Sequence, residues 1–262
     1  MQRIGIVGYG HVGGIMKELF ETAVVYDEPL YIGERTQINA CDYAFVCVPT
    51  PKAEDGSCDT SIVEDVLSWL DPKKAIIIRS TVPVGFTDTW NASKYPDHSK
   101  IIFQPEYYGE TKHHMFANPF NRSWITLGGD INVAHEVAEL YQTIFTSSLR
   151  IHFCSAKAAE LAKYMENSFF STKVTFCNQF YDLANALGIN YIEACEAWLM
   201  DPRIGDSHTQ VYPTNRGYGG SCLPKDTSAI IYQGDCNGVD MKLLKAVEEV
   251  NREYHERSNK TY

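Results

Sequence analysis

Short apolar runs recur along the first half of the chain, and segments with helical periodicity separate them. The runs lie at residues 2–7, 23–27, 43–48, 75–79, 101–103 and 124–127. Continuous apolar runs of this length are typical of strands that are buried on both faces. Strands that alternate with helical segments form a parallel sheet covered by helices on both sides. The pattern therefore predicts a doubly wound α/β domain of the Rossmann-like type over residues 1–150.

The pattern changes after that point. Residues 155–187 contain neither proline nor glycine and predict one long helix, which Ser155 can cap and Gly188 can end. Apolar side chains occupy more than one face of this helix, so we expect it to be buried. The chain continues with a shorter helix near 191–200, a glycine- and proline-rich loop over 203–222 and helices near 226–234 and 239–256. These elements predict a mostly helical domain over residues 151–262.

Composition narrows the possible functions. The 262 residues are 44% hydrophobic and 21% charged, as in an ordinary globular protein. A net charge of −10 argues against nucleic acid or an anionic membrane as the main partner. No apolar run is long enough to span a bilayer and no leader begins the chain, so we expect a cytoplasmic protein. The eight cysteines form no CxxC pair and the histidines lack metal-ligand spacing, so we predict no metal.

A glycine motif, Gly8-Tyr-Gly10-His-Val-Gly13, follows the first predicted strand and opens a helix. In that context Gly8 makes a tight turn, Gly10 admits a pyrophosphate and Gly13 lets the helix pack on the sheet. Asp27 ends the second strand, where a carboxylate can accept hydrogen bonds from the adenosine ribose and would repel a 2′-phosphate. A purely structural glycine turn is the alternative. The context favours a dinucleotide, with NAD preferred over NADP.

A second glycine-rich turn, Gly219-Gly-Ser-Cys222-Leu-Pro-Lys225-Asp226, holds a single cysteine beside charged side chains. A thiolate is a nucleophile, and nearby positive or polar groups favour its formation. The turn therefore indicates covalent cysteine chemistry.

The long predicted helix carries Glu160, Lys163 and Asn167 on one face, at spacings of i, i+3 and i+7. The lysine and the asparagine could donate hydrogen bonds to an oxyanion. On spacing alone, an exposed polar stripe is the better explanation of this face.

Acidic and hydroxyl side chains follow two predicted strands at their carboxyl ends, the edge where parallel sheets bind ligands. Glu106 and Glu110 lie just past the run 101–103, and Thr81 follows the run 75–79. A carboxylate there could activate water, and Thr81 could contact a cofactor or a water. Surface acidity and a helix cap are the alternatives.

Together these motifs resemble the UDP-glucose/GDP-mannose dehydrogenase family. The resemblance holds in order and spacing over most of residues 1–256. It is carried by Gly5-Ile-Val-Gly-Tyr-Gly, Val48-Pro-Thr-Pro, Ser80-Thr-Val-Pro-Val-Gly, Gln104-Pro-Glu, Glu160-Leu-Ala-Lys-Tyr-Met-Glu-Asn167, Arg203-Ile-Gly205 and Gly217-Tyr-Gly-Gly-Ser-Cys-Leu-Pro-Lys-Asp226. Enzymes of this family oxidise the C6 alcohol of a sugar nucleotide to a carboxylate with two NAD.

The resemblance implies a role for each matching residue. Cys222 would form a thiohemiacetal and then a thioester, and Lys163 and Asn167 would stabilise the oxyanions. Asp226 and Thr81 would hold a water, and Glu106 would assist hydrolysis of the thioester. Cofactor contacts would come from Gly8, Gly10, His11, Val12, Gly13, Asp27, Pro49, Thr50, Thr81, Glu110 and Lys225. Substrate contacts would come from Glu106, Lys163, Asn167, Arg203, Tyr212, Tyr218 and Gly219. The corresponding helix of the family implies a homodimer built on residues 155–187.

The chain departs from the family in two respects. Members are usually longer, with a second α/β domain that binds the nucleotide part of the substrate, and the segment between Asp27 and Cys41 is shortened here. We expect a short NAD-dependent sugar-nucleotide 6-dehydrogenase, similar to UDP-glucose 6-dehydrogenase. Two alternatives stay open, namely a two-electron hydroxyacid-type dehydrogenase and a non-catalytic NAD-binding or partner-dependent subunit.

Overall fold

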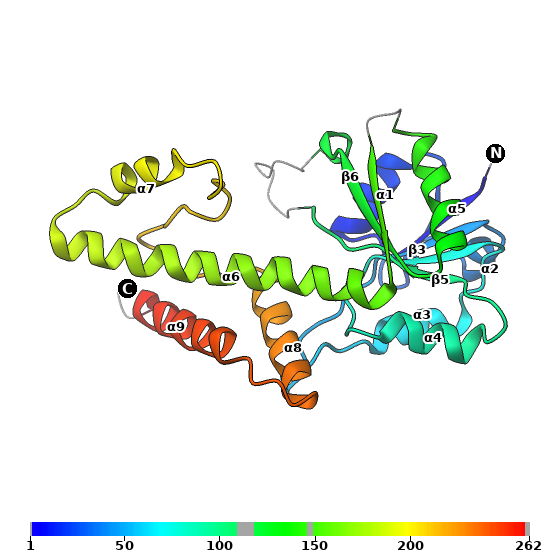
Figure 1. Cartoon of the computed structure of the whole chain (residues 1–262). Coiled ribbons are helices and arrows are strands. Elements are labelled where there is room, and N and C mark those ends of the chain that lie inside the picture. Colours follow the sequence, from blue (N-terminus) through cyan, green and yellow to red (C-terminus); the bar gives the residue numbers. More distant parts are fainter. Residues whose placement is uncertain (1, 109–117, 146–148, 260–262) are drawn as a thin grey trace. The chain divides into compact units, whose positions relative to one another are not determined.

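The computed structural model describes residues 2–108, 118–145 and 149–259. The chain forms two compact units. Unit 1 comprises Met1–Pro51 and Cys58–Lys163, and unit 2 comprises Lys52–Ser57 and Tyr164–Tyr262. Helix α6 (Ala156–Leu187) is one continuous helix that begins in unit 1 and continues in unit 2 (Figure 1). The boundary predicted from the sequence, at residue 150, falls on the first residue of a strand of unit 1.

The described part of unit 1 contains a seven-stranded sheet with strand order β2-β1-β3-β4-β5-β6-β7. Strands β1 to β5 are parallel to one another, which confirms the predicted doubly wound α/β class. The strands are β1 (Ile4–Val7), β2 (Val24–Tyr26), β3 (Tyr43–Val46), β4 (Ala75–Ile78), β5 (Ile101–Phe103), β6 (Trp124–Gly128) and β7 (Arg150–Cys154).

The far end of the sheet differs from the prediction in two ways. Strand β6 runs antiparallel to β5, and β7, which the sequence did not predict, runs parallel to β6. In the described part of the β5–β6 connection, the short 3-10 helix η1 (Pro119–Asn121) is the one regular element. An antiparallel neighbour, unlike a parallel one, needs no crossover helix to join it to the sheet. Strand β7 was missed because Arg150 and His152 interrupt its apolar residues.

Successive residues of each central strand point to opposite faces, and each face packs against its own helices. Helices α1 (His11–Leu19) and α5 (Ile131–Gln142) cover one face, where Ile6 and Phe45 are buried. The other face buries Val46 and Ile76. It is covered by α2 (Arg35–Asn39), α3 (Ser61–Trp69) and the partly buried side of α4 (Phe86–Lys94) (Figure 1).

Helix α6 begins and ends as its sequence predicts. Ser155 Oγ accepts a hydrogen bond from the Ala158 amide at 3.2 Å, and Gly188 takes a left-handed conformation (φ +69°) just past the last turn. The later helices are α7 (Tyr191–Leu199), α8 (Leu223–Cys236) and α9 (Lys242–Asn259). In the residues that the structure describes, no helix combines the length and the apolarity that crossing a bilayer requires.

Unit 2 includes a short piece from early in the chain. Ser228 Oγ, in α8, donates a hydrogen bond of 3.1 Å to the carbonyl oxygen of Gly56, which lies 172 residues earlier in the sequence. A side chain on Gly56 would approach the same hydroxyl to 2.9 Å. The segment 52–57 is therefore packed closely against α8 as a part of unit 2.

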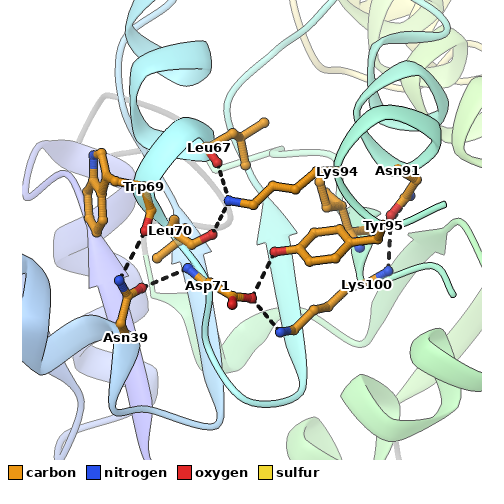
Figure 2. A network of polar contacts seen from close by, with 10 residues as sticks. Asn39, Leu67, Trp69, Leu70, Asp71, Asn91, Lys94, Tyr95 and Lys100 are labelled. Atoms are coloured by element: carbon orange, nitrogen blue, oxygen red, sulfur yellow. Dashed lines mark hydrogen bonds and ion pairs between the residues drawn. The ribbon is translucent and has the colours of Figure 1, made fainter. Parts of the chain in front are cut away.

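Polar contacts fasten the edge of the sheet where β3, β4 and β5 begin (Figure 2). Lys94, at the end of α4, donates to the carbonyl oxygens of Leu67 and Leu70, at 2.5 and 2.7 Å, and so satisfies carbonyl groups at the end of α3. Asn39, at the end of α2, accepts a 2.7 Å hydrogen bond from the Asp71 amide. These contacts lie at the opposite edge of the sheet from the carboxyl ends of the parallel strands.

The contribution of Asp71 to the stability of the fold depends on pH. Hydrogen bonding to Lys100, and then to Tyr95, outweighs partial burial and lowers the pKa of Asp71. A carboxylate with a lowered folded-state pKa stabilises the fold above its unfolded pKa of about 3.9 and loses that contribution as the pH falls through the folded value. Because the side chain is 59% exposed, we expect Asp71→Asn to cost no more than about 1 kcal/mol at pH 7.

Urea unfolding at pH 7 and at about pH 3 would measure this effect. The difference between Asp71→Asn and the unaltered chain should shrink toward zero at the lower pH. Asp97→Asn changes an exposed aspartate near the same edge and serves as the control. An Asp71→Asn deficit of equal size at both pH values would contradict the ionic origin.

Candidate functional site

The glycine turn after β1 has the geometry of a dinucleotide-binding turn. Gly8 is left-handed (φ +91°), and a Cβ there would come within 2.6 Å of the Cys47 carbonyl oxygen. A Cβ on Gly13 would collide with the Gly8 carbonyl group. Gly10 is exposed, and a Cβ on it would meet nothing within 4 Å. Gly8 and Gly13 are thus required by packing, while the open space at Gly10 suits the close approach of a pyrophosphate.

Asp27 is half-buried at the end of β2 and connects that strand to the glycine turn. Its carboxylate accepts the Tyr9 amide at 2.7 Å through one oxygen and the Leu30 amide at 2.9 Å through the other. A bridge between Asp27 and Ile32 closes the shortened turn that follows. The carboxylate is therefore held at the carboxyl edge of the sheet, beside the glycine turn, where a ribose would bind.

The other predicted cofactor residues of unit 1 lie at the same edge. His11 is exposed and Val12 is half-buried in the first turn of α1, where the amides of a helix N-terminus favour phosphate. Pro49 is exposed and Thr50 buried just past β3. Thr81 is buried past β4. Together with the glycine turn and Asp27, these residues fit a dinucleotide.

Two further acidic residues from the sequence analysis have different outcomes. Glu160 is fully buried in α6 and accepts the amides of Gly85 and Thr87 at 2.6 and 2.9 Å, so it caps the start of α4 within unit 1. Burial raises the pKa of Glu160, and these hydrogen bonds oppose the shift. The polar-stripe interpretation is wrong for this residue, because the side chain is inside the unit. Glu110 lies outside the described residues.

Glu106 is buried past β5 and is held by two cations. Arg79, at the end of β4, pairs with one carboxylate oxygen through Nη2, and the Tyr108 amide donates to the other. Lys163, in α6, donates to the backbone carbonyl oxygen of Glu106. Burial is the largest influence and lowers the pKa of Arg79, but the Glu106 carboxylate together with Tyr141, Tyr108 and Cys47 outweighs it, so the pKa of Arg79 is raised. The lysine and the carboxylate that the sequence placed 57 residues apart therefore lie together in unit 1.

An aromatic cluster beside Glu106 surrounds a second buried arginine. The Cζ atom of Arg122 lies 4.3 Å from the ring centroid of Trp124, 4.9 Å from that of Tyr107 and 5.2 Å from that of Tyr108. Arg122 is 3% exposed. Neither arginine was identified from the sequence. The available signal was an arginine that ends an apolar strand at the carboxyl edge (Arg79) and one that precedes the next strand (Arg122).

In unit 2, the predicted cysteine lies at the start of α8. Cys222 is the N-cap of this helix, which begins three residues earlier than predicted because Pro224 is compatible with the first turn. The Ser221 hydroxyl lies 3.6 Å from Cys222 Sγ. A helix N-terminus favours a thiolate over a thiol. The half-buried thiol of Cys222 therefore lies at the N-terminal end of α8.

Two buried polar residues join α6 to α8 within unit 2. Asn167 Nδ2 donates a 2.5 Å hydrogen bond to Asp226 Oδ2, and Lys225 pairs with the other carboxylate oxygen. Asn167 is 5% exposed and Asp226 is 1% exposed. A buried carboxylate requires such partners. The asparagine of the helix motif and the aspartate of the cysteine motif, 59 residues apart, therefore form one pair.

The remaining predicted substrate residues of unit 2 differ in their exposure to solvent and in their contacts. Tyr218 is 3% exposed, and its backbone amide and carbonyl are both bonded to Asn251 of α9, which is a structural role. Tyr212 is exposed. Gly219 is also exposed, and a Cβ on it would meet open space. The Arg203 side chain is 86% exposed and pairs with Asp201, two residues away in the sequence.

The arrangement gives each unit a distinct chemical capacity. Unit 1 has a dinucleotide turn and the buried Glu106, whose carboxylate pairs with Arg79 and whose backbone carbonyl oxygen accepts from Lys163. Unit 2 has a thiol at a helix N-terminus and a buried amide–carboxylate pair four residues along. Within the described ranges, no group of three or more histidine, cysteine, aspartate or glutamate side chains could hold a metal ion.

Curated relatives of this chain include two bacterial UDP-glucose 6-dehydrogenases. The chain is 29% identical over 228 residues to UDP-glucose 6-dehydrogenase of Rhizobium meliloti, covering 83% of this chain and 51% of the relative. It is 28% identical over 220 residues to UDP-glucose 6-dehydrogenase YwqF of Bacillus subtilis, covering 80% of this chain and 48% of the relative. The chain therefore spans about half the length of the curated relatives that it matches.

A solved structure agrees with the sequence comparisons. A UDP-glucose dehydrogenase from the archaeon Pyrobaculum islandicum superimposes with a TM-score of 0.83 at 26% identity, covering 97% of this chain and 68% of that chain. Two sequence profiles match along this chain. The UDP-glucose/GDP-mannose dehydrogenase family's NAD binding domain matches residues 30–145, and its central domain matches residues 157–253. These two matches show that the chain belongs to the UDP-glucose/GDP-mannose dehydrogenase family.

Proposed function

We propose that this chain carries out the NAD-dependent oxidation of the C6 alcohol of a sugar nucleotide to a carboxylate, in two successive two-electron steps. Its family membership and its NAD binding domain support the class of reaction. The observation that carries the four-electron version is the buried bond between Asn167 and Asp226. That bond joins the helix motif to the helix that Cys222 begins, and a two-electron dehydrogenase has no use for the thiol.

The proposed chemistry assigns a separate task to each group. Cys222 Sγ attacks the aldehyde carbon, so that a C–S bond forms and the carbonyl oxygen becomes an oxyanion. Lys163 and Asn167 stabilise that oxyanion and later that of the thioester hydrolysis. Bound NAD supplies the acceptor for the hydride that leaves C6 in each oxidation. In the last step water adds to the thioester carbon and the C–S bond breaks, which releases the carboxylate and returns the thiol.

The water that attacks the thioester must lose a proton and must be held close to the thioester carbon. Glu106 is the proposed proton acceptor, and Asp226 and Thr81 are the proposed groups that hold the water. Lys163, Glu106 and Thr81 belong to unit 1, whereas Cys222, Asn167 and Asp226 belong to unit 2.

Counting the NADH formed per substrate tests the proposal. The purified chain would be given a limiting amount of UDP-glucose, GDP-mannose or a UDP-N-acetyl sugar with excess NAD. Two NADH per sugar nucleotide, with acid as the product, is the expected result. One NADH per substrate would favour a hydroxyacid-type dehydrogenase. No turnover on any of the three would favour a non-catalytic or partner-dependent subunit.

Preference for NAD over NADP should depend on the charge of Asp27. We expect Asp27→Asn to narrow the preference by about tenfold or more, since it removes a like-charge clash with the 2′-phosphate. Asparagine keeps an acceptor for the Tyr9 or Leu30 amide, which alanine would not. Calorimetric titration with each cofactor would measure the ratio of affinities. Glu28→Gln, which neutralises the exposed neighbouring carboxylate, should leave the ratio within about twofold, and an equally large change there would refute the assignment to Asp27.

We also propose that the chain forms a homodimer through α6. The part of this helix in unit 2 exposes Met165, Phe169, Phe176, Phe180, Leu183 and Leu187, each between 43% and 64% exposed. Two other large apolar side chains of the helix are not part of this row, because Phe170 stacks on His208 with ring centroids 4.0 Å apart within unit 2 and Val174 is half-buried. A row of large apolar side chains over this length is typical of an interface.

Light scattering tests the dimer. We expect a mass of twice 29.6 kDa at micromolar concentration, and a monomer for Phe180→Glu, which would bury a charge at the centre of the row. Gln179→Glu adds the same charge at the adjacent exposed position and should leave the dimer intact. A monomeric unaltered chain would reject this proposal.

The eight cysteines, all of which are thiols in the described residues, support a cytoplasmic location, where thiols stay reduced.

A further inference from the structure

We propose that Arg122 is a positioning residue that holds the segment Glu106–Tyr108 in place. Through this segment it positions two groups of the proposed reaction, the Glu106 carboxylate and the Lys163 ammonium group. The inference rests on the proposed function for its catalytic consequence, and on the geometry of unit 1 for the rest.

Arg122 has aromatic rings as neighbours where a carboxylate would be expected. In the described part of the chain, no carboxylate lies within ion-pair distance of its guanidinium, and its buried Nε has no hydrogen-bond partner. Its Cζ lies instead between 4.3 and 5.2 Å from three ring centroids, those of Trp124, Tyr107 and Tyr108. A buried guanidinium is stabilised by the negative faces of such rings. The rings are in turn fixed by the cation that they surround.

Two of these rings belong to the residues that follow Glu106, and each leads to a reacting group. The Tyr108 amide donates to Glu106 Oε1, so the position of Tyr108 sets that of the carboxylate. The Tyr107 ring centroid lies 5.2 Å from Lys163 Nζ, which also donates to the Glu106 carbonyl oxygen. Displacement of the two rings would therefore move both the proposed proton acceptor and one proposed oxyanion donor.

Trp124 anchors the other side of the cluster. It is in β6, so its backbone is fixed by the sheet, and its ring centroid lies 5.0 Å from that of Tyr107. Arg122 thus connects a rigid strand to a segment that is not part of any strand or helix. Removal of its guanidinium would leave Glu106–Tyr108 held mainly by Arg79 and Lys163. Their distances to the Tyr108 and Tyr107 ring centroids, 5.8 and 5.2 Å, are longer than those of Arg122 to the same rings, 5.2 and 4.9 Å.

Hydrogen exchange of the Tyr108 amide tests the positioning without any need for activity. Local opening governs the exchange of an amide in such a segment. We expect Arg122→Leu to accelerate exchange of this amide by about tenfold or more. Arg122→Lys, which keeps the charge but loses the planar stack, should give an intermediate rate. Lys94→Met removes two hydrogen bonds at the opposite edge of the sheet and should leave the Tyr108 amide unchanged. An unchanged rate in Arg122→Leu would overturn the proposal.

Kinetics test the catalytic consequence. In Arg122→Leu we expect acid release to slow by about tenfold or more, with the affinity for NAD within about twofold of the unaltered chain and partial recovery in Arg122→Lys. Faster exchange with unaltered acid release would overturn the catalytic part and leave Arg122 a structural residue. If the unaltered chain forms no acid, the proposed function has failed, and the exchange measurement still decides whether Arg122 holds the segment.

Discussion

Replacing Cys222 by alanine is expected to reduce acid formation by roughly a thousandfold or more, while the affinity for NAD stays unchanged. The thiol is required only for the covalent stage, because a thioester cannot form without it. The residues that fit the cofactor, from Gly8 to Asp27, belong to unit 1, whereas Cys222 belongs to unit 2. Calorimetry would measure NAD binding, and chromatography would measure the acid.

A matched control is available on the same helix. Cys236 is an exposed thiol at the last residue of α8, and Cys236→Ala should produce acid at the unaltered rate. Normal acid production by Cys222→Ala would eliminate the covalent mechanism. A loss of NAD binding in that variant would instead point to a structural role for the turn.

Replacing Arg79 by methionine is expected to lower the free energy of unfolding of unit 1 by about 3–5 kcal/mol. The Arg79 side chain is 1% exposed and that of its partner Glu106 is 10% exposed. Removing one member of a buried ion pair leaves the other charge without compensation in a poorly solvating environment, and that cost sets the size of the effect. Urea unfolding would measure it by tryptophan fluorescence. A Trp198→Phe background would restrict the signal to the tryptophans of unit 1.

The double variant Arg79→Met/Glu106→Gln separates the charge from the packing. If the cost arises from the uncompensated carboxylate, neutralising Glu106 should restore at least about half of the lost stability. A double variant less stable than Arg79→Met alone would show that the arginine acts through its packing on Tyr108, whose ring centroid lies 5.8 Å from its Cζ atom.

The sheet and the long helix could be predicted because their signals are local. Residues 43–46 and 75–78 are continuous apolar runs, and Ser155 and Gly188 lie next to the ends of the helix that they limit. Strand β7 was not predicted from the sequence, because its residues are exposed or half-buried and do not form a continuous apolar run. The antiparallel direction of β6 could not be predicted, because hydrophobic periodicity identifies a strand but does not indicate the direction in which it pairs.

The candidate site was predictable only where a motif carried it. Cys222 and Asp226 are four residues apart, and the turn that contains them was evident from its glycines and its charges. The Arg79–Glu106 pair and the stack of Arg122 on Tyr107 join side chains from separate segments, 27 and 15 residues apart in the sequence. Such contacts follow from the register of the sheet, and no composition or spacing rule indicates them. Glu160 shows the opposite error, because helical spacing cannot distinguish an exposed stripe from a buried cap.

The assignment of residues 52–57 to unit 2 has a consequence for the order in which the chain matures. A ribosome adds about 5–20 residues per second, so the 172 residues between Gly56 and Ser228 take on the order of 10–30 s to synthesise. For most of that interval the strands on either side of the segment, β3 and β4, have been synthesised, while its own partner helix does not yet exist. Unit 1 can therefore collapse early around a strand-to-helix connection that waits for α8. A nascent chain arrested before residue 223 would expose that connection to protease, and release of the finished chain would bury it.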